Sequence, residues 1–565
     1  MDKWDGPTNI HPDGRHRVKS PLPGPAGLAI AAVLVLCLVA PPEVRGSGLA
    51  AVALFVAVAA SAVSATAASS SASRWLFAGV PLALVAGRMA IAPGEAVEPA
   101  IVILLAAIAG ISAAHAPERD DVFARIFAVL VAFAGGRAIY ETVWGLATMA
   151  DRVRATTPAG DALAVLGRLE QGRPYGGFST PAALGCFFIM TIPAVAAWAL
   201  GKRGAARAIG LGASALGASG LVATRSVTAM AALVVALALA GLRGRISTRI
   251  LAVSAGAIGL AIIGVGVLRP DAVFAPSREG SPWRLRAGNV RVALEIAQDH
   301  PLAGVGPGGY AEAFPQYRRA GDNESRHAHD LPAELLSEWG VPVGLALSAL
   351  FFWVFVGPVV SRSGDPRTWA SGLAVGVAAF AIHNLADFTA FLPSLLVFAA
   401  VCRGLIAPRV DRDRAAPALR LAWVGLAVAL AVVAAGAGLA REALFQSREA
   451  ATLGDHAAAL RFAERASAFA PWDADPPQFA AEARMAAGAD AAAVLHDAER
   501  AVRRAPWRAA ARSVRARVRA VSGDSTGAYA DLVEASRLYP LNASYAAQRD
   551  ALAAALGKAR EAAPR

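Results

Sequence analysis

A polar cluster lies between two long apolar segments of this chain. It places His327, His329 and Asp330 within the sequence RHAHDLPAELLSEWGVPVG at residues 326–344. A histidine ring titrates near neutral pH, so it can take a proton from a hydroxyl group, and a nearby carboxylate such as Asp330 can orient the ring. Polar groups at the mouth of a membrane span are costly and usually serve a function. We therefore interpret His329 as a candidate general base, with a solvated loop histidine as the alternative.

Arginines are concentrated in the segment that precedes this cluster. Residues 269–332 contain eight arginines, eight acidic residues and no lysine. A guanidinium group has a planar fork that matches phosphate. Arginine replaces lysine throughout the chain, so position is more informative than number. Arg286 opens a predicted helix that ends at His300-Pro301, before the glycines at 304–308. Those glycines follow a helix instead of opening one, which argues against a nucleotide-binding loop.

Further polar positions flank other apolar segments. Arg173 opens the sequence RPYGGFSTP and is a candidate contact for an anion, or part of a turn that enters a helix. Arg225 lies in TRSVT, at the end of an apolar segment, and is a further candidate contact for an anion. Glu334 and Glu338 are a helical turn apart and share a face. Glu338 is a candidate supporting residue, with helix capping or loop anchoring as the alternative to chemistry.

A histidine and an aspartate recur in a later apolar segment. His383 and Asp387 are four residues apart, so we expect them to share a helix face and to fasten helices together. The candidate site contains arginine and histidine without a carboxylate-rich cage, so we expect neither a metal ion nor a cofactor.

The composition places the chain in a membrane. Of its 565 residues, 56% are hydrophobic, and the mean hydropathy is +0.48. The three cysteines lie far apart in apolar segments and predict neither a disulfide framework nor a zinc site. The formal net charge is +12. Basic cytoplasmic loops and an anionic substrate account for this charge, and no nucleic-acid-binding motif is present.

The apolar segments predict an all-α, polytopic membrane helix bundle with 12–13 spans. The spans are expected near 26–40, 48–67, 75–92, 98–114, 122–148, 181–200, 207–223, 225–242, 250–268, 333–360, 369–388, 390–406 and 420–439. Basic short loops mark the cytoplasmic side, together with the tail at 1–25. The predicted membrane domain covers residues 26–440. Its two large loops, 149–180 and 269–332, are then expected on the external side of the membrane.

Residues 441–565 form a predicted helical-repeat domain. Glycine and proline recur there at intervals of 34 or 35 residues, at Gly454, Gly488 and Gly523 and at Pro471, Pro506 and Pro540. This period is typical of tetratricopeptide-like helix pairs; a generic alanine-rich bundle is the alternative. With thirteen spans the repeats are external. Their arginines at 504, 508, 512, 515 and 519 predict a solvated face, or a surface that docks an anionic glycan or a protein partner.

Five ordered elements between about 170 and 410 resemble the O-antigen ligase and polymerase family. The histidine pair resembles its signature motif, with Asp330 in place of the usual Asn. Arg286 stands where the family has an arginine fifteen residues before a proline, although Val290 replaces a usual tryptophan. The segment from Arg173 resembles another family element, with Thr180 replacing Asn. Two further resemblances are the TRSVT sequence, whose arginine is displaced by two places, and the sequence from His383 to Pro393.

This resemblance implies a bacterial inner-membrane glycosyltransferase. Such an enzyme transfers a glycan from undecaprenyl pyrophosphate to an acceptor at the periplasmic face, as in O-antigen ligation to lipid A-core. His329 would be the base, Arg286, Arg173 and Arg225 would contact pyrophosphate, and His327 would support the site. Alternatives are an O-antigen or exopolysaccharide polymerase and a protein O-oligosaccharyltransferase. A membrane scaffold that recruits a protein through its repeats, and a transporter, are further alternatives.

Overall fold

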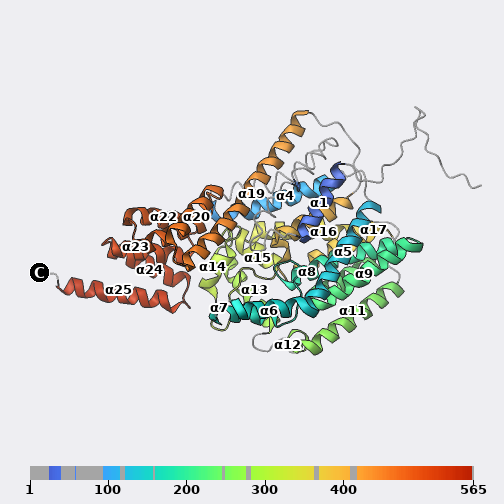
Figure 1. Cartoon of the computed structure of the whole chain (residues 1–565), viewed down its shortest axis with the longest axis horizontal. Coiled ribbons are helices and arrows are strands. Elements are labelled where there is room, and N and C mark those ends of the chain that lie inside the picture. The colour runs from blue at the N-terminus through green and yellow to red at the C-terminus, as the bar shows by residue number, and fades with distance from the viewer. Residues whose placement is uncertain are drawn as a thin grey trace, which may run out of the picture.

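The computed structural model describes residues 25–39, 57–58, 93–114, 121–156, 159–244, 248–274, 281–361, 368–407 and 417–562. Helices dominate, and no strand occurs in these ranges (Figure 1). The apolar part comprises α1 (Pro25–Val39), α4 (Pro93–Ala114), α5 (Asp121–Tyr140), the π-helical turn η2 (Glu141–Gly145), α6 (Leu146–Thr156), α8 (Pro181–Leu200), α9 (Gly204–Ala223), α10 (Val227–Leu242), α11 (Thr248–Leu268), α16 (Val341–Ser361), α17 (Trp369–His383) and α18 (Pro393–Leu405). The prediction of an all-α membrane protein is confirmed.

Six helices among the described residues are long and apolar enough to cross a membrane. They are Asp121–Ala155, Pro181–Leu200, Gly204–Ala223, Leu251–Leu268, Val341–Ser361 and Ala427–Thr452. Five shorter apolar helices coincide with the spans predicted near 26–40, 98–114, 225–242, 369–388 and 390–406. The spans predicted at 48–67 and 75–92 lie outside the described residues, except for 57–58.

The bundle is built around α8, which packs against α9 and α17. Glycine permits the closest approach. A β-carbon at Gly376 would collide with the α8 backbone at Met190, and one at Gly372 would collide with it at Pro193. Small residues let helix backbones approach in this way where lipid gives no net drive for association. The packing fixes α17 in the bundle centre, and with it the turn that follows α17.

Two predicted spans are shorter in the structure. The span predicted at 333–360 is divided by Gly340, whose φ is +76°, into α15 (Leu331–Trp339) and α16. A β-carbon at Gly340 would overlap the backbone at Leu302, so this kink is also a close contact. The span predicted at 369–388 ends as α17 at His383. Asp387 therefore lies in a turn, and the expectation that it shares a helix face with His383 is wrong.

The described part of the segment that the sequence predicts to be external folds into a small helical unit. It contains α12 (Pro270–Val273), α13 (Pro282–Asp299), α14 (Tyr310–Tyr317) and α15, and we call it the external unit. Its core consists of nine buried side chains among the described residues: Val292, Ala293, Ile296, Val305, Tyr310, Ala313, Phe314, Ala328 and Ala333. Ala328 lies between the two histidines of the polar cluster, so this core holds their loop directly.

The C-terminal segment is a series of stacked helices. It comprises α19 (Pro417–Thr452), α20 (His456–Phe469), α21 (Asp475–Ala486), α22 (Ala491–Arg504), α23 (Ala509–Val521), α24 (Ser525–Leu538) and α25 (Ala543–Ala562). Each helix packs against the next one in sequence. Gly454, Gly488 and Gly523 end α19, α21 and α23 with positive φ values, a conformation that glycine adopts without strain. The 34–35-residue spacing thus corresponds to a repeated helix pair.

The C-terminal helices lie beside the external unit (Figure 1). α24 packs against α14, and α22 packs against α4. The contact between α24 and α14 joins the C-terminal helices directly to the external unit.

The arginine row of the C-terminal helices is engaged in contacts within the chain. Arg515 Nε and Arg519 Nη1 lie 2.8 and 2.9 Å from Asp531 Oδ2, and Arg512 lies 3.9 Å from Asp531 Oδ1. Asp531 is only 3% exposed. Arg504 donates to the carbonyl of Asp473. The expectation of a solvated face is therefore wrong, because the buried Asp531 of α24 holds Arg515 and Arg519, and a backbone carbonyl holds Arg504.

Candidate functional site

An open cleft of about 630 Å³ lies between α13 and the turn after α17. One face of α13 supplies Trp283, Arg286, Val290 and Arg291, while His329 and Leu385 complete the lining. Arg286 and His329 are among the residues that line the cleft, whereas Arg173 and Arg225 are not. The structure thus brings together the candidate base and the main candidate anion contact.

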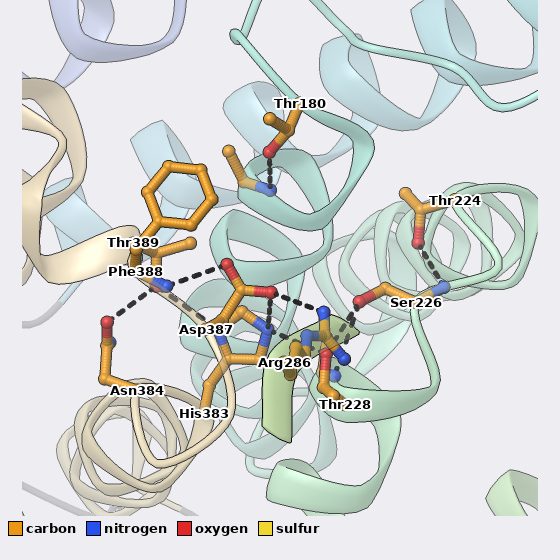
Figure 2. Close-up of polar contacts among 12 residues, drawn as sticks. Thr180, Thr224, Ser226, Thr228, Arg286, His383, Asn384, Asp387, Phe388 and Thr389 are labelled. Atoms are coloured by element: carbon orange, nitrogen blue, oxygen red, sulfur yellow. Dashed lines mark hydrogen bonds and ion pairs between the residues drawn. The ribbon is translucent and has the colours of Figure 1, made fainter. Parts of the chain in front are cut away.

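Arg286 is held by a buried carboxylate. Its Nη2 lies 3.2 Å from Asp387 Oδ2, and Asp387 is 1% exposed (Figure 2). The guanidinium also lies over the Trp283 ring, 5.5 Å from its centroid. An ion pair and a ring contact together restrict the orientation of the fork. Asp387 is in turn fixed by the Phe388 N–H, which donates to Oδ1 at 2.9 Å.

The turn that carries Asp387 is organised by His383 and Asn384. The His383 ring lies 3.3 Å from the hydroxyl of Thr228 on α10 and 3.2 Å from that of Thr389 (Figure 2). The side-chain oxygen of Asn384 accepts from Ala390 N at 2.7 Å. The backbone carbonyl of Asn384 accepts from Leu331 N at 2.8 Å. This last bond joins the turn to the start of α15. His383 and Asn384 therefore fasten helices together, as expected for His383.

His329 has an unusual backbone and an unpaired ring nitrogen. Its φ is +57°, a conformation that strains a non-glycine residue and is common at functional sites. Its Nδ1 is buried and has no hydrogen-bond partner among the described residues. The ring lies edge-on to Phe388, 4.8 Å between centroids. His329 thus lines the cleft from a constrained position.

Burial lowers the pKa of His329 from 6.5 to about 4. The charge of Asp387 opposes this shift, whereas the cationic neighbour Arg286 adds to it. The ring is consequently neutral at pH 7, which is the form that can accept a proton. The sequence predicts a pKa near the ordinary value, because it does not show that the ring is partly buried.

The other members of the polar cluster position the loop. The His327 ring stacks on Phe388 at 4.6 Å, and its Nδ1 lies 2.7 Å from Glu334 Oε1. Glu334 also accepts from Ala328 N at 2.8 Å and is 1% exposed. Glu334 therefore clamps the backbone between the two histidines, a role that its charge and helical position alone did not reveal.

Asp330 and Glu338 each accept a hydrogen bond from a backbone amide, which is a structural role. Asp330 caps α15, accepting from Ala333 N at 2.8 Å, and burial raises the pKa of its carboxyl. Its side chain is thus directed to the helix terminus, and the expectation that it orients His329 is replaced by a capping contact. Glu338 is buried and accepts from Tyr310 N at 3.4 Å, which fits the anchoring alternative.

Arg173 and Arg225 lie on two loops that bond each other. Arg173 Nε donates to the Thr224 carbonyl at 2.8 Å, and Arg225 Nη1 donates to the Gln171 carbonyl at 2.9 Å. Burial lowers the pKa of Arg173 to about 10, and the nearby charge of Arg269 adds to the shift. Arg286 contributes in the same direction, so the charges of these three guanidiniums act on one another.

Two residues that the sequence analysis does not single out, Arg269 and Glu141, also act on the Arg173 loop. The charge of Arg269 acts on Arg173. Arg269 directly follows the apolar α11, and this position at the end of a span is the signal that could have identified it. Glu141, in η2, accepts from the Tyr175 and Gly176 amides at 2.7 and 2.8 Å and pairs with Arg137 at 2.9 Å. Single π-helical turns are frequent at functional sites. Glu141 shapes the loop that presents Arg173.

In the part of the chain that the structure describes, no group of three histidine, cysteine, aspartate or glutamate side chains is placed to hold a metal ion. The arrangement instead offers a neutral imidazole and a fixed guanidinium on one cleft. These groups suit proton removal from a hydroxyl and neutralisation of an anionic leaving group.

Comparison with known families matches residues 212–348 to the O-antigen ligase family model, about a quarter of the chain. The matched segment contains Arg286 and His329, whereas Arg173 and Asp387 lie outside it. A comparison with curated proteins found no match. The matched segment, together with the apolar helices, supports an O-antigen ligase-family enzyme of a bacterial membrane with a glycan-transfer role in polysaccharide assembly.

Proposed function

We propose that the chain transfers a glycan from undecaprenyl pyrophosphate to an acceptor hydroxyl at the periplasmic face of the inner membrane, as in O-antigen ligation to lipid A-core. The observation that carries this proposal is the shared cleft of Arg286 and His329, beside the buried Asp387. The cleft lies where the external unit meets the apolar helices, a position that suits a donor with a lipid tail and a polar head.

In the proposed step, the acceptor oxygen attacks the anomeric carbon of the donor glycan. The bond between that carbon and the pyrophosphate oxygen breaks, and His329 takes the hydroxyl proton. Arg286 neutralises the charge that develops on the leaving pyrophosphate. Fixed donors aimed at developing charge commonly provide the largest single catalytic effect. The ion pair with Asp387 holds Arg286 ready, so little reorganisation is needed during the reaction.

The remaining candidate residues act around this pair. Arg173 adds positive charge near Arg286, and we propose that it contacts the pyrophosphate. Arg225 donates a hydrogen bond to the loop that carries Arg173. We therefore assign Arg225 two roles: it positions that loop, and it contacts the pyrophosphate. His327, through Glu334, and Asp330, through the α15 cap, fix the backbone on either side of His329.

We further propose that the external unit is periplasmic and that 441–565 is a tetratricopeptide-like repeat domain. The direct packing of α14 on α24 supports a common side of the membrane for both. Alkaline phosphatase fused at the C-terminus is expected to be active. A fluorescent cytoplasmic GFP fusion at the same position would place both parts in the cytoplasm and would contradict the periplasmic site.

The function is tested by reconstitution. The purified chain in proteoliposomes is given an undecaprenyl-pyrophosphate-linked glycan and lipid A-core, and the expected product is glycosylated lipid A-core. A ladder of lengthened lipid-linked glycan without transfer to the core would identify a polymerase instead. Transfer to a protein alone would identify a protein glycosyltransferase, and no transfer to any acceptor would favour the scaffold alternative.

A further inference from the structure

Two turns of the C-terminal helices carry aromatic residues that contact the external unit. Trp507, between α22 and α23, packs against the core of that unit. Tyr539, after α24, meets the Arg318 guanidinium at 3.1 Å and also bonds Glu324. These two turns thus form one docking edge.

Trp507 completes the core that holds the histidine loop. That core has nine buried side chains among the described residues, one of which is Ala328. Trp507 packs on it and lies edge-on to His300, 5.2 Å between ring centroids. Small cores contribute little stability by themselves, so one large added aromatic side chain is a substantial fraction of the buried surface. The external unit therefore depends on a residue supplied by the C-terminal helices.

Arg508 adds an ion pair next to this aromatic contact. Its Nη2 and Nε lie 2.6 and 3.1 Å from Glu312 Oε1, and Arg508 also pairs with Asp475. The side chains of Arg508 and Glu312 are 16% and 25% exposed. A two-donor ion pair with this degree of burial is more directional than a surface pair. It fixes the position of α14.

α14 connects the two helices that present the candidate site. The Tyr310 hydroxyl donates to the Asn289 carbonyl on α13 at 3.0 Å, three residues beyond Arg286. The Tyr310 amide donates to Glu338 on α15, the helix that follows His329. A displacement of α14 would therefore change the separation of Arg286 and His329 without altering either residue.

We propose that the C-terminal helices act as a brace for the external unit, with Trp507 and Arg508 as positioning residues for transfer. This inference rests on the proposed function. The brace sets the distance across the cleft, so its loss affects turnover more than donor binding. Small displacements of reacting groups have large effects on rate.

The test is a charge swap in the full-length chain, reconstituted in proteoliposomes. Arg508→Glu and Glu312→Arg each place like charges together, and kcat is expected to fall roughly tenfold with KM changed less than about twofold. The double variant restores the opposite-charge pair between positions 508 and 312, while the new carboxylate at 508 still faces Asp475. Its kcat is therefore expected to be higher than that of either single variant. Arg503→Glu is the matched control, because Arg503 lies on α22 with its side chain 62% exposed, and kcat should be unchanged.

A second measurement is independent of transfer. Hydrogen exchange of the amides at 318–330 is expected to speed up in both single variants and to return toward the wild-type rate in the double variant. Trp507→Ala should give the same increase and Trp507→Phe a smaller one, since phenylalanine retains much of the ring contact. Increased exchange in a chain that shows no transfer would leave the brace standing and would contradict only the proposed function.

Two outcomes would overturn the brace. One is unchanged kcat and unchanged exchange in the single charge variants. The other is a loss of kcat that the double variant fails to recover even in part, because a true positioning contact is restored when its partners are exchanged.

Discussion

Two buried aspartates show how differently this chain uses arginine. Asp531 in α24 receives Arg515 and Arg519 at hydrogen-bonding distance, with Arg512 nearby. Asp387 is paired with Arg286, which also lines the open cleft. The first arrangement closes a helix stack, whereas the second holds a cation ready for a ligand.

The number of arginines in a segment therefore does not distinguish structural arginines from binding ones. The carboxylates that neutralise them, and their access to a cleft, do. The arginine row of α22 and α23 predicts a solvated face, with docking of an anionic glycan or a protein partner as the alternative, but Asp531 of the next helix holds Arg515 and Arg519. Arg286 stands in a less conspicuous sequence context, yet it lines a cleft shared with a neutral imidazole.

The largest effect is expected at His329. His329→Ala should lower the transfer rate roughly 10³-fold, within the range for loss of a general base, while membrane insertion remains normal. Initial rates in proteoliposomes, normalised to folded protein, measure it. Near-wild-type transfer by a well-inserted variant would remove His329 from the mechanism.

Arg286→Lys tests the geometry of the cation. Lysine keeps the charge but loses the fork, so transfer should fall roughly 10- to 100-fold, as expected when paired hydrogen bonds to phosphate are lost. Arg284→Lys, an exposed change on the same helix, is the matched control and should retain activity. Full activity in Arg286→Lys would show that local charge alone suffices.

Asp531→Asn examines the other side of the comparison. It leaves the guanidiniums of α23 around a neutral amide, so the C-terminal helices should lose about 2–4 kcal/mol of stability. The melting temperature of the purified chain should fall, while kcat of the folded protein at low temperature stays within about twofold of wild type. An unaltered melting temperature would mean that Asp531 does not hold the stack.

The pH profile follows from the lowered pKa of His329. The neutral ring persists down to pH about 4, so kcat/KM should be flat from pH 8 to pH 5 and fall below about 4. The unfolded ring binds a proton at the higher pKa of 6.5, so His329 also makes folding less favourable as pH falls from 6.5 to 4. An acid limb of kcat/KM centred near 6.5 would contradict the buried, neutral base.

The smallest effect is expected from a chelator. The site presents imidazole and guanidinium groups, so EDTA should leave transfer unchanged. The control is a metal-dependent glycosyltransferase assayed in the same buffer. Activity that is lost in EDTA and restored by Mg²⁺ or Mn²⁺ would require a metal-assisted step.

Several features were available from the sequence alone because they are local. Length and hydrophobicity located the apolar helices, since a span must satisfy its backbone within one continuous segment. Glycine and proline spacing located the helix pairs of the C-terminal segment. The Asp330-Leu-Pro sequence also carries a helix-start signal, an acidic cap followed by proline in the first turn, and a closer interpretation would have predicted its cap.

Tertiary structure decided how distant residues meet. Arg286 and Asp387 are 101 positions apart, and only the packing of α17 in the bundle brings the turn after it to α13. The pKa of His329 depends on burial and on charges from three segments, and the arginines of α23 meet Asp531 because α24 folds back on them. Periodicity determines local conformation, but it carries no information about which buried charge faces another. The sequence identified His329 and Arg286 as candidates, whereas the packing of the helices decided that they share one cleft and that Asp387 holds Arg286.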